Sequence, residues 1–179
     1  MSFSFSSLAI DGLWLVVPKP FEDPRGFFME TYKTSEFVGK GISETFVQDN
    51  HSLSKRGVLR GLHFQKAPAP QAKLVRVLAG AVWDVAVDLR PGSTSFGKWF
   101  GVELTSKNLR MLYIPEGFAH GFLSLADNTE LVYKCSAEYR ADLDAGVRWD
   151  DPDLGIDWPN RNVTLSDKDA ALPYLRDLS

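Results

Sequence analysis

The three histidines of this chain, His51, His63 and His120, have the ordinary pKa closest to neutral, which makes them the first candidates for proton transfer. His63 lies in the β-rich run Gly-Val-Leu-Arg-Gly-Leu-His-Phe-Gln, which also carries Arg60. A polar side chain in an apolar strand either has a hydrogen-bond partner or lines a cavity. Taken alone, each histidine is more often an ordinary surface or core residue, so the neighbouring residues must decide.

A metal centre is one chemistry that these histidines could serve. Iron, manganese and zinc sites in β-barrels often use a His-x-His pair together with a carboxylate. The corresponding triplet here is His63-Phe64-Gln65, and no second histidine lies nearby in the sequence. Because glutamine is a poor ligand for these ions, the pattern argues against a metal site.

General acid–base catalysis is the other chemistry. It needs a base with a pKa near neutral, a group that orients the base, an acid on the opposite side of the substrate, and a stabiliser of developing oxyanion charge. The chain supplies these four residue types as His63, Asp169, Tyr133 and Lys73. Their spacing in the sequence alone would not bring them together.

Size, charge and cysteine content limit the class of protein. The chain has 179 residues, a mass of 20.0 kDa and a net charge of −3, which suit one globular domain without a positive field for nucleic acid or anionic lipid. Its one cysteine, Cys135, cannot form an intrachain disulfide, and no apolar run approaches about 18 residues. The first seven residues do not resemble a secretory signal. We therefore expect a cytoplasmic protein with no nucleic-acid or membrane partner.

Short β-rich runs separated by Gly, Pro, Asp and Asn dominate the chain. They are Leu13 to Val17, Gly26 to Tyr32, Thr45 to Gln48, Val58 to Phe64, Lys73 to Leu78, Val82 to Leu89, Lys98 to Leu104, Arg110 to Ile114, Gly121 to Leu125 and Glu130 to Ser136. Such spacing predicts an antiparallel sandwich or barrel. Short helices are expected only at Thr34 to Val38 and after Ser166, where Ser-Asp-Lys-Asp has the form of a capping box.

Several segments, in the same order along the chain, strongly resemble the dTDP-4-dehydrorhamnose 3,5-epimerase family. They are Asp-Pro-Arg-Gly-Phe-Phe from residue 23, Gln-Asp-Asn-His-Ser from 48, Gly-Val-Leu-Arg-Gly-Leu-His-Phe-Gln from 57, Gln-Ala-Lys-Leu-Val from 71, Trp-Asp-Val-Ala-Val-Asp-Leu-Arg from 83, Ile-Pro-Glu-Gly-Phe-Ala-His-Gly-Phe from 114, Tyr-Lys-Cys from 133 and Leu-Ser-Asp-Lys-Asp from 165. The resemblance runs from about residue 23 to residue 169 and covers most of the chain.

This resemblance implies an all-β, cupin-type jelly roll with a few short peripheral helices, usually a homodimer, that works without metal or organic cofactor. The implied reaction inverts C3 and C5 of dTDP-4-dehydro-6-deoxy-D-glucose and gives dTDP-4-dehydro-L-rhamnose, a step of rhamnose biosynthesis. Both carbons flank the C4 ketone, so loss of either proton gives an enolate. We expect residues 1–179 to form a single domain, with an N-terminal strand arm and a C-terminal tail that wraps the sandwich.

The resemblance also assigns a role to each candidate residue. It implies that His63 is the base, that Asp169 orients it, that Lys73 stabilises the enolate and that Tyr133 is the acid. Without the resemblance, the capping box would offer a purely structural role for Asp169. The substrate-binding residues that we expect are Arg60, Arg25 and His120 for the diphosphate, and Gln48, Asn50, Glu30 and Tyr139 for the nucleoside.

Strict alternation along a strand would send Arg60 and His63 to opposite faces, although both are expected in one pocket. We therefore predict a bulge or kink at Gly61, which glycine would permit. Two alternatives to the double epimerase stay open at this point. One is a relative that inverts a single carbon, and the other is a sugar-nucleotide-binding module without catalysis.

Overall fold

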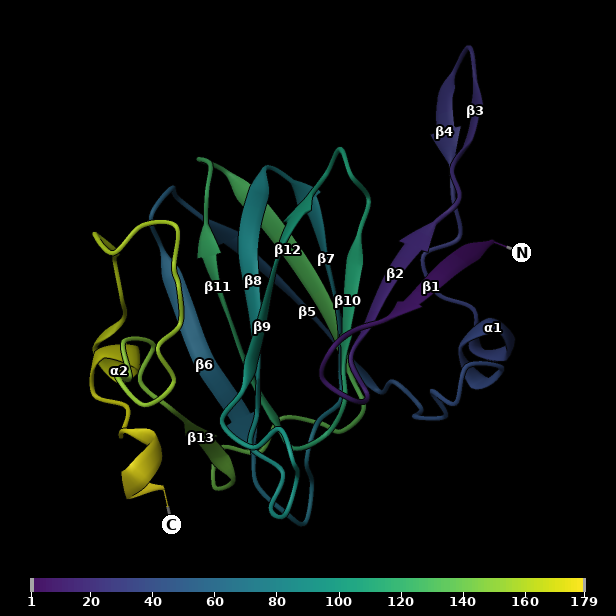
Figure 1. Ribbon diagram of the computed structural model, residues 1–179. Coiled ribbons are helices and arrows are strands. Elements are labelled where there is room, and N and C mark those ends of the chain that lie inside the picture. Colours follow the sequence, from purple (N-terminus) through teal and green to yellow (C-terminus); the bar gives the residue numbers. More distant parts are fainter. Residues whose placement is uncertain (1, 179) are drawn as a thin grey trace.

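Two antiparallel β-sheets face each other in the computed structural model, which describes residues 2–178 (Figure 1). The first sheet orders its strands as β1 (Phe3–Ser7), β2 (Trp14–Pro18), β10 (Met111–Ile114), β7 (Lys73–Ala79), β12 (Thr129–Cys135) and β5 (Gln48–Ser54). The second sheet orders its strands as β13 (Asp144–Gly146), β6 (Leu59–Gln65), β11 (Phe118–Ser124), β8 (Ala81–Asp88) and β9 (Trp99–Thr105). Most neighbours in each sheet come from distant parts of the chain, as in a double-sheet jelly roll, and only β1–β2 and β8–β9 are consecutive. The predicted all-β, cupin-type jelly roll is confirmed.

The remaining elements are short and peripheral. They are the hairpin of β3 (Phe21–Asp23) and β4 (Gly26–Phe28), the helices α1 (Thr34–Val38) and α2 (Asp167–Ala170), and the 3-10 turn η1 (Leu175–Asp177). Both predicted helices are confirmed, and Ser166 caps α2 by accepting a hydrogen bond from the backbone N–H of Asp169. None of the helices between residues 2 and 178 is long and apolar enough to cross a membrane.

The main error of the sequence analysis in strand placement concerns β5. The predicted run Thr45 to Gln48 overlaps this strand only at its first residue, and β1, β3 and β13 do not appear among the predicted runs. The sequence of β5, Gln-Asp-Asn-His-Ser-Leu-Ser, is almost entirely polar because the strand forms one edge of the first sheet. An edge strand next to a polar pocket lacks the apolar alternation from which strands are predicted.

The hydrophobic residues form a core between the sheets and a layer on the outer face of each sheet. Strand β8 shows the division. Val82 and Ala86 belong to the core between the sheets, whereas Val85 and Val87 belong to the cluster outside the second sheet. The chain after β13 covers that outer cluster with Val147, Leu154, Ile156 and Trp158. The alternation along β8 therefore separates two environments.

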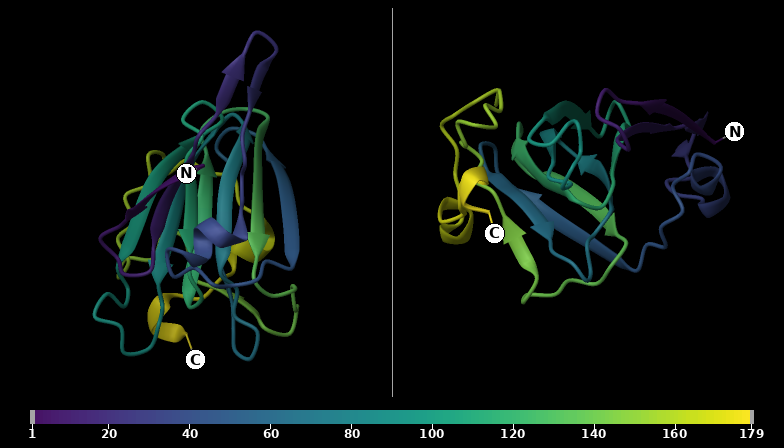
Figure 2. Two further views of the ribbon diagram at one scale, coloured as in Figure 1. Left: turned by 90° about the vertical axis from the view of Figure 1, so that its right-hand side faces the viewer. Right: turned by 60° about the horizontal axis from the view of Figure 1, so that its bottom comes forward.

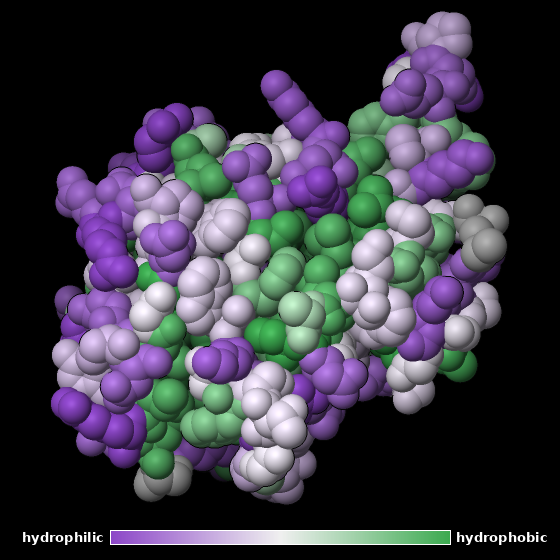
Figure 3. Space-filling view, in the orientation of Figure 1, coloured by the Kyte–Doolittle hydropathy of each residue, from purple (hydrophilic) through white to green (hydrophobic). Residues whose placement is uncertain are grey.

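The β3–β4 hairpin projects away from the sandwich beside the N-terminal strands, as Figures 1 and 2 show from different sides. Its residues Phe21, Phe27 and Phe28 are 52%, 59% and 69% exposed. Figure 3 shows hydrophilic residues at the tip of the hairpin and hydrophobic residues in a band across the middle of the body. We call the segment from Phe21 to Phe28 the hairpin arm.

Strand β6 carries an extra residue at Gly61. His63 pairs with His120 of β11, and Arg60 pairs with Phe122, so three steps along β6 match two along β11. As a result, the side chains of both Arg60 and His63 reach one pocket. The predicted irregularity at Gly61 is confirmed.

Only glycine fits at this bulge. Gly61 has a φ of +120°, and a Cβ atom there would lie 2.5 Å from the Cα of Gly121 and 2.8 Å from the carbonyl oxygen of His120. Both neighbours are backbone atoms of a central strand, so neither can move aside without disturbing the ladder. The close approach of β6 to β11 therefore depends on the missing side chain.

We expect Gly61→Ala to lower the free energy of unfolding by about 3 kcal/mol or more, because backbone strain and a backbone clash add at one position. Gly26→Ala is the matched control, since Gly26 has a φ of +126° and a Cβ atom added there would meet no other atom within 4 Å. Because the tip of the arm can relax into solvent, that control should cost less than about 1 kcal/mol. Urea unfolding measures both, and equal losses would contradict the importance of the close approach.

Candidate active site

A pocket of about 240 Å³ is lined by residues from both sheets and from α2. The lining residues are Ser52, Arg60, His63, Lys73, His120, Gly121, Phe122, Tyr133, Ser166, Lys168 and Asp169. All four residues predicted for acid–base chemistry are among them, as are Arg60 and His120. Residues far apart in the sequence thus meet in one cavity because the two sheets face each other.

The closest contact in this pocket joins the histidine of β6 to the carboxylate of α2. Nε2 of His63 lies 2.6 Å from Oδ1 of Asp169. The side chain of Asp169 is 5% exposed and that of His63 is 32% exposed, so the imidazole borders the cavity and the carboxylate lies behind it. In a capping box this acidic side chain would bond back to the start of its own helix. Here the backbone N–H of Asp169 donates to the cap residue Ser166, and the side chain of Asp169 holds His63.

Opposing effects determine the ionisation of Asp169. Burial alone would raise the pKa of its carboxyl group, but hydrogen bonds and charge attraction involving His63, together with contacts to Ser166 and the backbone of Gly61, lower the pKa below its ordinary value. The carboxylate is therefore ionised at neutral pH and accepts the hydrogen bond, so Nε2 of His63 carries the hydrogen. The lone pair of the neutral ring is then on Nδ1.

Lys73 and Tyr133 enter the pocket from adjacent strands of the opposite sheet. Lys73 is buried, its Nζ donates a 3.4 Å hydrogen bond to the carbonyl of His63, and it lies 5.8 Å from the centre of the Tyr133 ring. Burial lowers the pKa of Lys73. Burial, followed by the nearby Cys135, raises the pKa of the Tyr133 phenol, which keeps it protonated at neutral pH.

His120 is held by a carboxylate that the sequence analysis did not single out. Its Nε2 lies 2.9 Å and 3.1 Å from the two carboxylate oxygens of Asp84, which is fully buried. The imidazole also stands 6.3 Å from the Tyr133 ring, nearly edge-on. The available signal was the alternation of β8, where Asp84 shares the inward face with Val82 and Ala86.

A smaller adjoining pocket of about 120 Å³ shares His63, Lys73, Tyr133 and Lys168 with the first and adds Tyr139 and Asp144. The Tyr139 hydroxyl donates a 2.9 Å hydrogen bond to Asp144, and Lys168 forms an ion pair with the same carboxylate. Neither Asp144 nor Lys168 was predicted as a site residue. The sequence of the aspartate-rich C-terminal segment gave no indication that either side chain would lie at the pocket.

Polar side chains of β5 connect the smaller pocket to the edge of the first sheet. Gln48 donates a 3.0 Å hydrogen bond to Asn50 and accepts one of 2.7 Å from the backbone N–H of Tyr139. Arg60 donates to the Ser54 hydroxyl at 3.2 Å. These predicted substrate-binding residues thus lie near the cavity, although Gln48 and Asn50 do not line the main pocket.

Two predicted binding residues, Arg25 and Glu30, do not line the pocket of the chain to which they belong. Arg25 is at the tip of the hairpin arm, with a 90% exposed side chain that pairs with Asp23 at 2.6 Å. Glu30 lies 3.7 Å from Lys33, just after the arm. The third histidine, His51, pairs with Glu130 at 3.1 Å outside the main pocket. Between residues 2 and 178, no group of three or more His, Cys, Asp or Glu is arranged to hold a metal ion.

We expect Asp169→Asn to lower the free energy of unfolding by about 1 to 3 kcal/mol at neutral pH. A carboxyl whose pKa is lower in the folded than in the unfolded state stabilises the fold above its ordinary pKa, near 4, and stops doing so as the pH falls through its folded-state pKa. The difference between wild type and variant should therefore shrink below about pH 4. Denaturant unfolding at several pH values measures this difference in the free energy of unfolding. Asp167→Asn, at an exposed position of the same helix, is the control and should change the free energy of unfolding at neutral pH by less than about 0.5 kcal/mol.

Comparison with known proteins agrees with this geometry. A family model described as dTDP-4-dehydrorhamnose 3,5-epimerase matches residues 7–177. The enzyme of that name from Methanothermobacter thermautotrophicus is 49% identical over 98% of this chain and 96% of its own length. The crystal structure of the Legionella pneumophila enzyme in complex with dTDP-4-keto-L-rhamnose has a TM-score of 0.95 and 45% identity, and covers 99% of this chain and 95% of that one. ChmJ, a 3'-monoepimerase from Streptomyces bikiniensis, has a TM-score of 0.88 and 37% identity, and covers 94% of this chain and 86% of that one. This chain belongs to the dTDP-4-dehydrorhamnose 3,5-epimerase family.

Proposed function

We propose that this protein is an isomerase that inverts C3 and C5 of dTDP-4-dehydro-6-deoxy-D-glucose and releases dTDP-4-dehydro-L-rhamnose. One observation carries the proposal. His63 of the second sheet, held by Asp169 of α2, faces a protonated tyrosine and a buried lysine of the first sheet across a single pocket. Removing a proton on one side of a sugar ring and returning one on the other requires this opposed arrangement.

His63 acts as the base. Because its Nε2–H is bound to ionised Asp169, the lone pair of Nδ1 accepts the proton from the carbon next to the ketone. Asp169 then stabilises the imidazolium, as carboxylates do in other histidine–aspartate pairs. The same base serves C3 and C5 in turn, since both carbons are adjacent to the C4 carbonyl.

Lys73 stabilises the enolate. Its ammonium group donates to a backbone carbonyl, and between residues 2 and 178 no carboxylate forms an ion pair with it, so N–H donors are available for the C4 oxygen. A donor placed at a developing oxyanion is commonly worth about 3 to 4 kcal/mol of barrier. Tyr133 reprotonates the opposite face of the ring, and its raised pKa keeps the phenol in the donor form.

The nucleotide part of the substrate is anionic, whereas the chain as a whole carries a net charge of −3. Arg60 and His120 line the pocket and are the residues that we assign to the diphosphate, because guanidinium offers paired donors to phosphate oxygens. Gln48, Asn50 and Tyr139 are assigned to the nucleoside, through hydrogen bonds and ring stacking. No metal or organic cofactor is needed for this scheme, since each step is a proton transfer between side chain and carbon.

The domain organisation and the compartment are proposed on simpler grounds. Residues 1–179 act as one jelly-roll domain, because the chain after β13 supplies apolar side chains to the outer face of the second sheet. The compartment that we propose is the cytoplasm, since the single cysteine, Cys135, is a free thiol.

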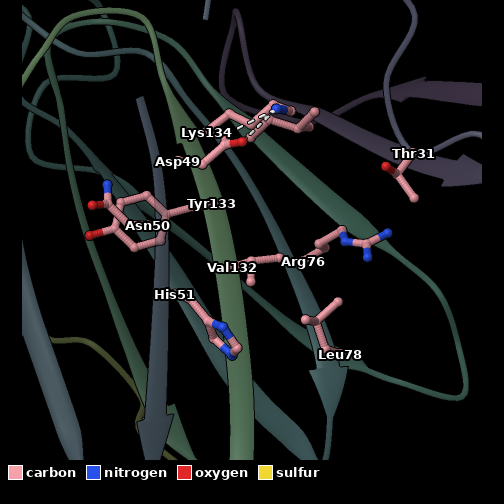
Figure 4. A pocket seen from close by; sticks show the side chains of 10 residues that line it. Thr31, Asp49, Asn50, His51, Arg76, Leu78, Val132, Tyr133 and Lys134 are labelled. Atoms are coloured by element: carbon pink, nitrogen blue, oxygen red, sulfur yellow. Dashed lines mark hydrogen bonds and ion pairs between the residues drawn. The ribbon is translucent and has the colours of Figure 1, made fainter. Parts of the chain in front are cut away.

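We further propose that the enzyme is a homodimer in which the hairpin arm of one subunit reaches the pocket of the other. The arm exposes three phenylalanines, and its own chain gives Arg25 no contact with the pocket. A second pocket, of about 310 Å³, lies on the outer face of the first sheet, as Figure 4 shows from close by. Arg76, which lines it, has a buried nitrogen without a partner among the described residues, and the exposed Leu78 lies beside it. A second copy would cover both features.

In D₂O, the wild-type enzyme should introduce deuterium from solvent at both C3 and C5 of the dTDP-4-keto-6-deoxy sugar, as followed by NMR. Each inversion exchanges the carbon-bound hydrogen through a group that equilibrates with water. His63→Ala should reduce exchange at both carbons by about 10²- to 10⁴-fold, the usual contribution of a general base. Exchange at the wild-type rate in that variant would remove His63 from the mechanism.

The same experiment tests a second candidate function. Because the chain also resembles a 3'-monoepimerase, inversion of a single carbon is the alternative, and label at one carbon only would establish it. If deuterium enters at neither carbon although the protein still binds the nucleotide, the protein is a binding module without catalysis.

Mixing two inactive variants tests the dimer. Arg25→Ala and His63→Ala are each expected to be deficient, but in a hybrid dimer one pocket has an intact His63 and receives an intact arm. Random exchange of subunits should then restore about one quarter of wild-type activity. Recovery requires that the arm and the pocket come from different subunits. If both variants are inactive alone and the mixture shows no gain after subunit exchange, the arm does not act across the interface.

A further inference from the structure

The buried side chain of Gln65 has no part in the acid–base scheme. Gln65 ends β6, two residues after His63, and is 5% exposed. Its Nε2 donates hydrogen bonds to the carbonyl of Ala69 at 2.5 Å and to the carbonyl of Glu138 at 3.1 Å. Its Oε1 accepts a 2.8 Å hydrogen bond from the backbone N–H of Arg140. The amide group therefore joins the strand that carries His63 to two loops.

The backbone partners fix the orientation of this amide. Two carbonyl oxygens face its nitrogen and one N–H faces its oxygen, so only this orientation satisfies all three backbone groups. Gln65 also lines the smaller pocket, but both of its N–H donors are used by the two carbonyls. Gln65 is therefore suited to hold the backbone rather than to bind a substrate.

The second of the two loops joins β12 to β13 and carries Tyr139. Glu138 and Arg140, the two partners of Gln65 in this loop, directly flank Tyr139. The backbone N–H of Tyr139 itself donates a 2.7 Å hydrogen bond to Oε1 of Gln48. Residues 138–140 have no regular secondary structure, and side-chain amides supply the backbone partners that a ladder would otherwise supply.

The ring of Tyr139 is exposed although its backbone is held. Tyr139 is 54% exposed, borders the smaller pocket, and donates its hydroxyl hydrogen to Asp144. An aromatic ring on a loosely held loop would have to be ordered each time a nucleotide binds, and that ordering lowers affinity. A backbone that is already held removes most of this cost before binding.

We propose that Gln65 is a positioning residue for Tyr139: its amide holds the backbone on both sides of this tyrosine and so fixes the ring at the pocket before the nucleotide arrives. The inference rests on the proposed function for the assignment of Tyr139 to the nucleoside. The hydrogen bonds of Gln65 belong to the free protein. Within the triplet His63-Phe64-Gln65, the first residue then serves catalysis and the third serves nucleotide affinity.

Gln65→Met tests the inference first in the absence of substrate. Methionine is close to glutamine in length and volume and lacks the amide, so all three hydrogen bonds are lost while the buried volume is kept. Amide hydrogen exchange, followed by ¹⁵N NMR, should become faster at Arg140 by about tenfold or more. The N–H of Val147, which donates to the carbonyl of Leu62 on the same strand β6, should exchange at the wild-type rate.

The same variant should weaken nucleotide binding and spare the chemical step. We expect Gln65→Met to raise the Kd of dTDP and the KM of the sugar nucleotide by about tenfold, because the ring of Tyr139 must then be ordered on binding. The kcat should stay within about twofold of the wild-type value, since His63 keeps its contact with Asp169. Calorimetric titration with dTDP and steady-state kinetics measure these quantities.

Gln71→Met is the matched control, since it removes the same chemical group from another partner in the same loop. Gln71 donates a 2.8 Å hydrogen bond to the carbonyl of Ala137, which does not flank Tyr139. This variant should therefore change the Kd of dTDP by less than about twofold.

A double-mutant cycle shows whether Gln65 acts through Tyr139. Tyr139→Ala removes the ring and should raise the Kd of dTDP by about tenfold or more, the usual effect of losing a base-stacking aromatic. If Gln65 acts through that ring, adding Gln65→Met to Tyr139→Ala should raise the Kd further by less than about twofold. A merely structural role of Gln65 would give the full loss of affinity in both backgrounds.

Four results would overturn the inference. They are a wild-type Kd of dTDP in folded Gln65→Met, additive effects in the cycle, an equal loss of affinity in Gln71→Met, and a fall in kcat at unchanged KM. If Gln65→Met does not fold, Gln65→Glu decides. Its carboxylate still accepts from the N–H of Arg140 but cannot donate to the two carbonyls, so the same loss of affinity is expected.

The proposed function and this inference fail in different ways. A wild-type protein that binds dTDP without exchanging deuterium would reject the proposed function, while the titrations with dTDP would still decide the role of Gln65. A wild-type protein that does not bind dTDP would overturn both.

Discussion

The hydrogen bond between His63 and Asp169 is the interaction on which the rest of the site depends. It joins β6, an inner strand of the second sheet, to a four-residue helix near the C-terminus. A helix this short has no stability of its own. Its position comes from the Ser166 cap, from Arg148, which donates to the carbonyl of Ala170 at 2.9 Å, and from the apolar tail that covers the second sheet. The packing of the tail therefore fixes the position of Asp169 and, through it, the orientation of His63.

The two sheets divide the chemistry between them. The second sheet supplies His63 and His120, each bound to a carboxylate, and the first supplies Lys73 and Tyr133. Because each sheet is held by its own ladder and by the core between them, the separation of His63 from Tyr133 does not rely on a flexible loop. This arrangement requires an irregularity at Gly61, where β6 departs from a regular ladder. Because of it, Arg60 and His63 line the same pocket.

Much of this arrangement could be predicted from the sequence, and what could not has physical causes. The bulge at Gly61 followed from alternation, and the strand pattern predicted the sandwich. Asp144 and Lys168 were missed because their meeting depends on how an irregular tail returns to the sheet, which no periodicity encodes. Strand β5 was missed because an edge strand beside a polar pocket carries polar residues on both faces. The pairing of Asp169 with His63 was predicted from the family resemblance and could not be predicted from their spacing in the sequence.

The pairing of charges shows how an acidic chain can bind an anionic substrate. Arg25, Arg90, Arg140 and Arg148 each pair with an aspartate two positions away, so their charge is largely cancelled where it stands. Arg60 instead donates to a hydroxyl and a backbone carbonyl, and it keeps its full charge at the mouth of the pocket. The local positive potential thus comes from the few cationic side chains that have no carboxylate partner, rather than from the total number of cationic side chains. By the same argument, Arg25 can contribute to a neighbouring subunit's pocket only if its contact with Asp23 yields to the diphosphate.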